Sequence, residues 1–338
     1  MRNIKTAVNQ NINYLVMVSV CLILIISISF NSLAKDKVFL NIGTTNQTSS
    51  SYGYYVQLLK VFNKYAPHFK ATVIETGAAV DNIRRLARGE IEAGLAMDDP
   101  MYQAYHGLGK WEGEPVSELR TLLMWTKNMV PYVVRADSDI YSVYDLDGLP
   151  FSPGMRGSGN EASCEMILGF LGIEPKWFRG SLADAIDAMK DRRIVGTNKG
   201  SNLNKPDAAF LELQTFMKLR PLNWPNDLIE KVKAEYPYLP TATIPAGTFN
   251  GQTEDVNTWG MVMGDVATSN MSEEVGYDWV KASFDGKDML AIVYPEVNDI
   301  DWVEVTLEST IPLHAGTIKY FREMGVEIPE ELIPPEVN

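Results

Sequence analysis

Short apolar runs alternate with stretches of helical periodicity along most of this chain, and the alternation predicts an α/β fold. Val38–Ile42 has the pattern of a strand and Tyr52–Tyr65 that of a helix with one apolar face, and the polar loop Gly43–Ser51 joins them. Further strands are predicted at Ala71–Ile74, Ile91–Ala96, Leu119–Trp125, Val130–Val134, Leu149–Pro153, Trp177–Arg179, Ile194–Asn198 and Trp259–Met263. Further helices are predicted at Val80–Leu86, Ser158–Leu171, Leu182–Met189, Pro206–Met217, Asn270–Phe284 and Thr317–Met324.

Two segments about 100 residues apart share one layout. Glu75–Ile91 and Arg179–Ile194 each contain a turn of small residues, a short helix, a basic turn and the start of a strand. Either one α/β unit is used in each of two lobes, or two ordinary units are alike by chance. We expect a first lobe of residues 35–129 with a return segment at 265–338, a second lobe of residues 130–264, and a ligand cleft between them.

Residues 1–34 have the layout of a secretory signal peptide. Arg2 and Lys5 give a positive start, Tyr14–Phe30 is an almost unbroken apolar run, and Ser32–Ala34 offers a small-residue cleavage site. We expect cleavage after Ala34 and export to the periplasm. An uncleaved membrane anchor is the alternative, because the apolar run approaches the length that spans a bilayer.

The net charge of the chain limits the classes of partner that it can bind. The 338 residues are 46% hydrophobic and 22% charged, which is ordinary for a globular core, and the formal net charge is −13. Cleavage would take Arg2 and Lys5 from the 30 basic residues and leave 28 against 43 acidic ones, about −15. Such a surface repels nucleic acid and anionic membranes, so we expect no nucleic-acid partner, and an anionic ligand would need a local positive pocket.

The sequence contains no motif for catalysis, a cofactor or a metal. His68, His106 and His314 are far apart, and no HExxH, paired CxxC, GxSxG or GxxxxGK[ST] pattern occurs. Cys164, the one cysteine after residue 34, lies among apolar residues of a predicted helix and is expected to be a buried thiol. We therefore predict a protein that is not an enzyme and that uses no cofactor and no metal.

Two polar loops before helices suggest capture of an anion. The loop at 44–51, rich in serine and threonine, precedes the helix predicted from Tyr52, and Arg156-Gly157-Ser158 precedes the next such helix. Free N–H groups and the helix dipole favour a carboxylate or phosphate there, and an arginine can grip a carboxylate through two hydrogen bonds. A capped surface loop and a solvated arginine are the alternatives.

Further candidate residues lie at predicted strand ends. Lys199 follows the strand Ile194–Asn198, at the end where ligands of open α/β sheets gather, and the alternative is a solvated loop lysine. Asp98 and Asp99 end another strand, where they contact a ligand amine or a hinge, or simply form a turn. Trp125 ends the strand predicted at Leu119–Trp125, and it is expected to pack either on a ligand or in the core or the hinge.

At this point the residues match a known family. The chain resembles the TAXI family of TRAP-transporter solute receptors over nearly all of residues 37–334. The resemblance implies a two-lobed periplasmic binding protein fold (type II-like), with a mixed sheet flanked by helices in each lobe, a paired permease driven by an ion gradient, and small carboxylate ligands such as glutamate or 2-oxoglutarate. The segments that carry it are Val73–Asn82, Tyr102–Gly107, Val133–Ser138, Arg156–Glu161, Ala242–Phe249, Gly251–Val256 and Pro312–Gly316.

The resemblance also implies where the ligand is held. Two loops depart from the family pattern: Asn46–Ser51 stands where many members have a glycine-rich loop, and Gly200–Lys205 lacks the usual glycines and prolines. Both touch the expected site, so the ligand itself is not carried over. With Trp125 added from the strand pattern, the predicted ligand-binding residues are Thr45, Ser50, Ser51, Tyr52, Asp99, Trp125, Arg156, Gly157, Ser158, Asn160, Asn198 and Lys199.

The prediction is therefore an extracytoplasmic receptor, expected to be a monomer, that captures a small anionic solute by lobe closure and delivers it to a TRAP permease. One alternative is a binding protein of the same fold for an ABC transporter or a membrane sensor. Another is a two-lobed enzyme, for which Cys164 and Lys199 would be the candidate reactive residues.

Overall fold

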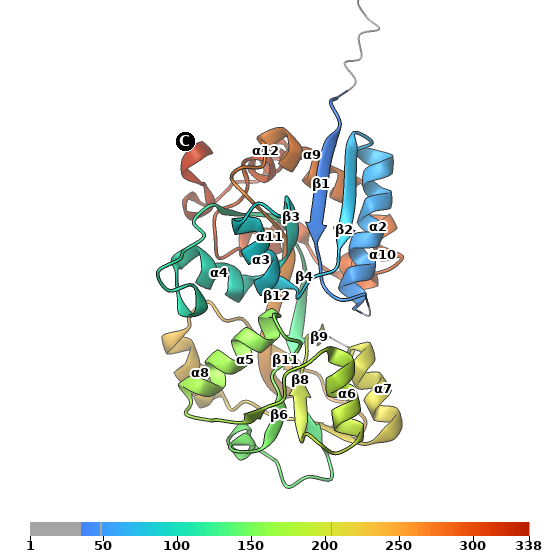
Figure 1. Cartoon of the computed structure of the whole chain (residues 1–338), viewed down its shortest axis with the longest axis vertical. Helices are drawn as coiled ribbons and strands as arrows, with labels where there is room; N and C mark the ends of the chain where they lie inside the picture. The colour runs from blue at the N-terminus through green and yellow to red at the C-terminus, as the bar shows by residue number, and fades with distance from the viewer. Residues whose placement is uncertain (1–34, 48, 204, 338) are drawn as a thin grey trace, which may run out of the picture. The chain divides into compact units, whose positions relative to one another are not determined.

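The computed structural model describes residues 35–47, 49–203 and 205–337, and its fold is that of the compact unit Val38–Asn338 (Figure 1). The predicted signal peptide, residues 1–34, lies outside the described residues. Within the described ranges, no helix combines the length and the apolar character needed to cross a membrane.

A seven-stranded mixed sheet forms the first lobe. Its strand order is β2-β1-β3-β12-β4-β9, and β11 pairs with β12. The three strands β2, β1 and β3 run parallel, whereas β12 is antiparallel to β3, β4 and β11. The strands are β1 (Val38–Gly43), β2 (Phe69–Ile74), β3 (Ala93–Met97), β4 (Leu119–Val130), β9 (Ser201–Asn202), β11 (Thr241–Ile244) and β12 (Val256–Thr268).

A five-stranded mixed sheet forms the second lobe, in the order β10-β5-β8-β6-β7. Strand β6 is parallel to β7 and β8, and β5 is antiparallel to β8 and β10. The strands are β5 (Tyr132–Arg135), β6 (Pro150–Ser152), β7 (Lys176–Trp177), β8 (Gly196–Asn198) and β10 (Leu219–Pro221). The predicted two-lobed α/β fold, with a mixed sheet flanked by helices in each lobe, is confirmed.

Helices cover both sheets, and in Figure 1 α2 and α10 lie to the right of the first sheet with α3 and α4 to its left. The first lobe carries α2 (Ser50–Tyr65), α3 (Ala79–Ala87), α4 (Asp98–His106), α9 (Glu273–Asp285), α10 (Lys287–Ala291), α11 (Trp302–Leu307) and α12 (Ala315–Glu323). The second carries α5 (Gly159–Phe170), α6 (Leu182–Lys190), α7 (Ala208–Phe216) and α8 (Asn226–Glu235). Short 3-10 turns lie at Gly109–Trp111, Val143–Leu146, Pro295–Asp299, Glu330–Leu332 and Pro335–Val337.

Two long strands, β4 and β12, reach the place where the two lobes meet. β4 and β12 pair along nearly their whole length, from Leu119 opposite Thr268 to Val130 opposite Trp259. The sequence predicts much shorter strands here, because polar residues such as Lys127 and Asp265 interrupt the apolar pattern. Antiparallel pairing overrides that interruption by satisfying the backbone groups of both strands. The predicted lobe boundaries at 129/130 and 264/265 fall within these strands, and their position stays a prediction.

A buried carboxylate organises the core of the first lobe. Asp265 on β12 is fully buried, and its oxygens accept hydrogen bonds from the Tyr55 hydroxyl at 2.6 Å, the Trp125 ring nitrogen at 3.0 Å and the Trp279 ring nitrogen at 2.7 Å. Burial raises the pKa of Asp265 to about 6, and the three donors act in the opposite direction. Because each charge-assisted bond contributes about 1.5–3 kcal/mol, this centre fixes three aromatic side chains of the core.

Several helix ends differ from the sequence prediction. Of the alternatives for Asp98 and Asp99, the plain turn is not what forms, because both residues lie in the first turn of α4. Pro100 conceals that helix in the sequence, although proline is tolerated in a first turn, where its missing N–H has no helical partner. Ser158 caps α5 and Ser272 caps α9, since each side chain accepts a hydrogen bond from a backbone N–H of the first turn.

Candidate functional site

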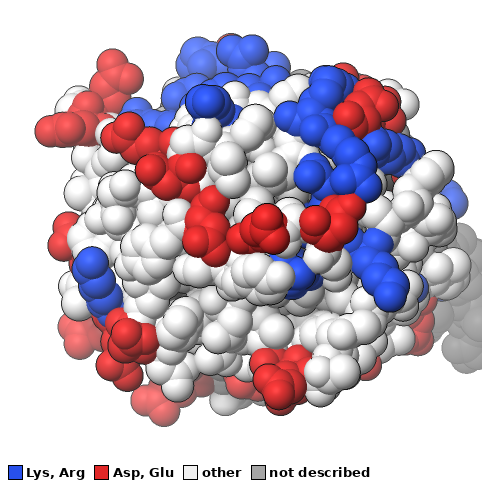
Figure 2. Space-filling model, turned by 90° about the horizontal axis from the view of Figure 1, so that it is seen from below, with Lys and Arg blue, Asp and Glu red and all other residues white. Residues whose placement is uncertain are grey.

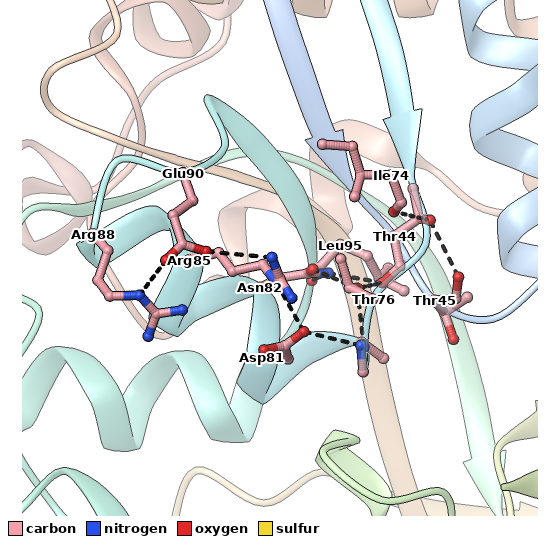
Figure 3. Close-up of polar contacts among 12 residues, drawn as sticks. Thr44, Thr45, Ile74, Thr76, Asp81, Asn82, Arg85, Arg88, Glu90 and Leu95 are labelled. Carbon is pink, nitrogen blue, oxygen red and sulfur yellow. Dashed lines mark hydrogen bonds and ion pairs between the residues drawn. The ribbon is translucent and has the colours of Figure 1, made fainter.

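A polar network fixes the start of the loop after β1 (Figure 3). The amide nitrogen of the buried Asn82 donates to the carbonyl oxygens of Thr44 at 2.8 Å and Leu95 at 2.9 Å. The Asn82 amide oxygen lies 2.7 Å from the Thr76 hydroxyl, and the Thr44 hydroxyl donates to the carbonyl oxygen of Ile74 at 2.8 Å. The ends of β1, β2 and β3 are thereby tied to α3.

Glycines bring the two lobes into close contact. A Cβ added to Gly159, the first residue of α5, would lie 2.4 Å from Sδ of Met97. A Cβ on Gly157, which has a φ of +82°, would lie 3.1 Å from the carbonyl oxygen of Gly77. Asp81 fixes that turn by accepting the Gly77 N–H at 3.0 Å. Larger residues at Gly157 or Gly159 would therefore hold the lobes apart.

A nearly closed cavity lies where the lobes meet. The space that the centre of a water molecule can reach inside it is about 20 Å³, enough for about one water. The first lobe contributes the β3–α4 junction, the second contributes β5, α5 and β8, and β4 and β12 complete the wall. The described lining residues are Met97, Asp98, Asp99, Val130, Tyr132, Asn160, Ser163, Ile167, Asn198, Leu239, Pro240, Trp259, Gly260 and Met261.

Buried polar atoms without a protein partner gather on this wall. Among the described residues they include Oδ1 of Asp99, Oδ1 of Asn160, both amide atoms of Asn198, and Nε1 of Trp259. Asn198 is 1% exposed and Asp99 is 2% exposed. Burying a polar atom without a hydrogen bond costs about 1–3 kcal/mol. This cluster therefore lowers the stability of the folded protein until a bound molecule supplies hydrogen-bond partners.

Two carboxyl groups face the same cavity. Burial raises the pKa of Asp98 to about 7, with backbone N–H groups acting in the opposite direction and Glu308 adding to the rise. Burial and the neighbouring Asp98 raise the pKa of Asp99 well above its usual value, although the hydroxyl of Ser163 hydrogen-bonds Oδ2. None of the described lining residues is Lys, Arg or His.

Aromatic rings complete the cavity. Tyr132 and Trp259 line it and are 1% and 3% exposed. Burial raises the pKa of Tyr132 well above 10, so its hydroxyl stays neutral, and the nearby Asn198 amide acts in the opposite direction. The Asn198 atoms nevertheless form no hydrogen bond of normal geometry with a described residue.

The structure brings three of the predicted site residues into this cavity: Asp99, Asn160 and Asn198. They come from three separate elements, the first turn of α4, the first turn of α5, and the end of β8. Their use as ligand contacts stays a prediction.

Three others, Arg156, Gly157 and Ser158, line a different hollow that is open to solvent. The space that the centre of a water molecule can reach in this hollow is about 280 Å³, and Arg156 itself is exposed. Most of its charged side chains already have partners: Lys110 with Glu165, Arg179 with Glu161 and Glu165, and Arg84 over the ring of Trp111. The other described lining residues are Val80, Arg84, Lys110, Glu161 and Arg179.

The remaining predicted residues lie outside both spaces. Lys199 forms an ion pair with Asp207 at 2.9 Å. Trp125 is fully buried and stacks on Tyr54, with ring centroids 3.9 Å apart, which is the core position that the sequence left open. Thr45 is a buried loop residue, and Ser50, Ser51 and Tyr52 begin α2.

The surface charge is not uniform. Figure 2, a view of the lower end of the molecule in Figure 1, shows basic side chains gathered towards part of the rim and acidic ones spread over the rest. The net charge of −13 therefore does not decide the local charge at any one hollow.

Comparison with known proteins places the chain in a family. The model of the NMT1-like family matches residues 42–325, which is most of the chain. The chain belongs to the NMT1-like family. This NMT1-like chain is also similar, at the level of general fold, to solved structures of binding and transporter proteins.

Three of these structures illustrate the likeness. The periplasmic aliphatic sulphonate binding protein of Escherichia coli is 16% identical, with 84% of this chain and 82% of that chain covered and a TM-score of 0.45. A putative L-cystine ABC transporter protein of Listeria monocytogenes is 14% identical, with coverage of 78% and 97% and a TM-score of 0.48. A cysteine-binding protein of Campylobacter jejuni is 12% identical, with coverage of 77% and 88% and a TM-score of 0.45.

Sequence reasoning missed several cavity residues of this NMT1-like protein. Tyr132, Ser163 and Trp259 lie within predicted strands or a predicted helix, where they are indistinguishable from ordinary core positions. One signal was available: Ser163 follows Asn160 by three residues, so both project from one face of a predicted helix start.

Proposed function

We propose that this NMT1-like protein is a solute receptor that captures a small solute between its lobes and presents it to a membrane importer. The observation that carries the proposal is the convergence of unpartnered buried polar atoms, from both lobes, on one cavity. A solute that supplies hydrogen-bond partners offsets the free-energy cost of burying these atoms. Ligand binding therefore stabilises the closed form.

Capture requires the lobes to separate. The present cavity has room for about one water, so an organic solute enters only when Asp99 of one lobe moves away from Asn160 and Asn198 of the other. We place the hinge in β4 and β12, where the lobe boundaries at 129/130 and 264/265 fall. Gly157 and Gly159 permit the close contact of the closed form.

A carboxylate bound at Arg156 is a second candidate. Four basic side chains line the open hollow, and Gly157 and Ser158 lie just before α5, whose N-terminal N–H groups favour an anion. The ion pairs of Lys110 and Arg179 with Glu161 and Glu165 reduce the positive charge available there. We therefore rank this hollow below the enclosed cavity.

Two classes of importer are candidates for the partner. The segments that resemble TAXI receptors favour a TRAP permease, and a binding protein for an ABC-type importer is the alternative. We further propose that residues 1–34 direct export to the periplasm. The genes beside this one, and the mass of the exported chain, distinguish these alternatives.

Isothermal titration of residues 35–338 with a panel of small solutes tests the proposal. We expect at least one solute to bind with a dissociation constant below about 100 µM, which corresponds to about 5.5 kcal/mol, and to raise the thermal midpoint with concentration. Binding that persists after Asn198→Leu, in a correctly folded variant, would place the solute elsewhere and contradict the proposed site.

A further inference from the structure

We propose that the enclosed cavity selects solutes that carry a positively charged nitrogen, with Asp99 as the counter-ion; this rests on the proposed function of the same cavity. The sequence favours the opposite charge, an anion held by arginine. The geometry favours a cation because acidic and amide groups, and no described basic ones, line the space.

The first argument is the type of atom left without a partner. Three of the unpartnered atoms are acceptors: Oδ1 of Asp99, Oδ1 of Asn160 and the amide oxygen of Asn198. An ammonium group presents three N–H donors and no acceptor, as a lysine side chain does. A solute with an ammonium group therefore supplies what these three oxygens lack, whereas a carboxylate adds further acceptors to them.

The second argument is that Asp99 is held in place for such a contact. Its Oδ2 is hydrogen-bonded by the Ser163 hydroxyl, which leaves Oδ1 as the atom without a partner. Asp99 also lies in the first turn of α4, where the helix dipole favours a negative charge. A solute cation near Asp99 would restore the charged form of this buried carboxyl, because opposite charge offsets the cost of burial.

The third argument is the aromatic wall. Tyr132 and Trp259 line the same cavity, and the face of an aromatic ring attracts a cation within about 6 Å. The remaining unpartnered donors, Nε1 of Trp259 and the amide nitrogen of Asn198, are available to an acceptor elsewhere on the solute. An amine that also carries an oxygen therefore offers both the donors and the acceptor that these atoms lack.

The same arrangement makes binding depend on pH. Asp98 and Asp99 are easily protonated because they are buried side by side, and a protonated pair competes with a solute cation. The groups that act on the pair are Glu308, which raises the pKa of Asp98, and the Ser163 hydroxyl, while Tyr132 and Tyr238 stay neutral near it. Affinity for an amine should therefore rise between pH 5 and pH 8, with proton release.

The test compares solutes that carry amine nitrogen with analogues that lack it. Residues 35–338 would be titrated at pH 5, 6.5 and 8 with L-glutamate and glutarate, with L-lysine and hexanoate, and with putrescine and butane-1,4-diol. We expect binding of at least one nitrogen-bearing member, at least 30-fold more tightly than its partner, and at least tenfold more tightly at pH 8 than at pH 5.

Two variants complete the test. Asp99→Asn keeps the shape and removes the charge, and should weaken amine binding at least 100-fold and abolish its pH dependence. Asp187→Asn removes the same charge from an exposed position on α6 and should leave binding unchanged. Circular dichroism and the thermal midpoint establish that both variants are folded.

The outcomes separate the inference from the proposed function. Equal binding of both members of a pair, or binding of glutarate that Asp99→Asn does not weaken, overturns the inference and leaves a solute receptor for anions. Binding of no compound to the folded wild-type chain overturns both.

Discussion

The two spaces described here differ in charge and in exposure, and residues that the sequence predicts for the ligand site lie in both of them. The open hollow contains Arg156 and three more basic residues, of which Lys110 and Arg179 are already paired with glutamates, and Arg156 is exposed. The enclosed cavity contains two aspartates whose surroundings raise their pKa. Exposure decides which space holds a charged ligand more tightly, because a charge in water interacts weakly with a ligand and a buried charge interacts strongly.

The largest effect that we expect concerns the pH dependence of stability. The pKa of Asp98 is about 7 in the folded protein and close to 3.8 when unfolded, so the folded state binds a proton more tightly. Stability from this group is therefore present below about pH 4 and lost as the pH rises to 7, by up to about 4 kcal/mol. Urea unfolding of the ligand-free protein at pH 4.5, 6 and 7.5 should show a steeper fall for wild type than for Asp98→Asn. Parallel curves would mean that the cavity is wetter than its geometry indicates.

Closure offers the next largest effect. Gly159→Val puts side-chain atoms where Met97 now lies, so it should disfavour the closed form and weaken solute binding by about 2–3 kcal/mol, roughly 30- to 150-fold. Gly169→Val, in the same helix α5 but with open space around it, is the matched control and should bind normally. Titration of both variants with the best solute provides the measurement. Equal affinities would show that lobe closure does not contribute to binding.

Asn198 should separate binding from stability. Asn198→Leu replaces an unpartnered buried amide with an apolar group of similar size, so the ligand-free protein should become more stable by about 1–2 kcal/mol. The same change should weaken solute binding at least tenfold. Chemical unfolding and titration of one sample report both quantities, and a loss of stability would indicate that the amide has a structural partner.

Arg156 should produce the smallest effect. The side chain is exposed, so Arg156→Ala should change solute affinity by less than about 0.5 kcal/mol, roughly twofold. A loss of 2–5 kcal/mol, the size expected for a buried ion pair with a carboxylate, would reverse the ranking of the two spaces. Titration with a carboxylate and with an amine decides between them.

Much of the fold follows from the sequence alone. The strand Val38–Ile42, the helix face of Tyr55 and Leu58, and the capping serine Ser158 are set by hydrophobic period and by local hydrogen bonding. Such features involve neighbours in the chain, and for that reason the sequence predicts them. Helix α4 is an instructive exception, since Pro100 reads locally as a break and is tolerated only because it lies in the first turn.

The candidate site could be predicted only in part. The strand pattern placed Asp99 near a ligand, because it follows a strand at the edge of the sheet, and the resemblance to TAXI receptors placed Asn160 and Asn198 there. The sequence could not show that Arg156 faces another hollow, that Lys199 pairs with Asp207, or that Trp125 belongs to the core. These facts depend on partners far away in the chain.

The sequence by itself determined the two-lobed α/β fold, a buried Cys164 and a net acidic chain, because periodicity and composition are properties of the chain. Only the tertiary structure decided which polar residues share a wall and which of them lack partners. Asp99 and Asn198 are almost 100 residues apart, and their meeting in one cavity follows from the packing of two sheets. Burial is a property of that packing, and it strengthens the electrostatic interactions of those side chains with a ligand.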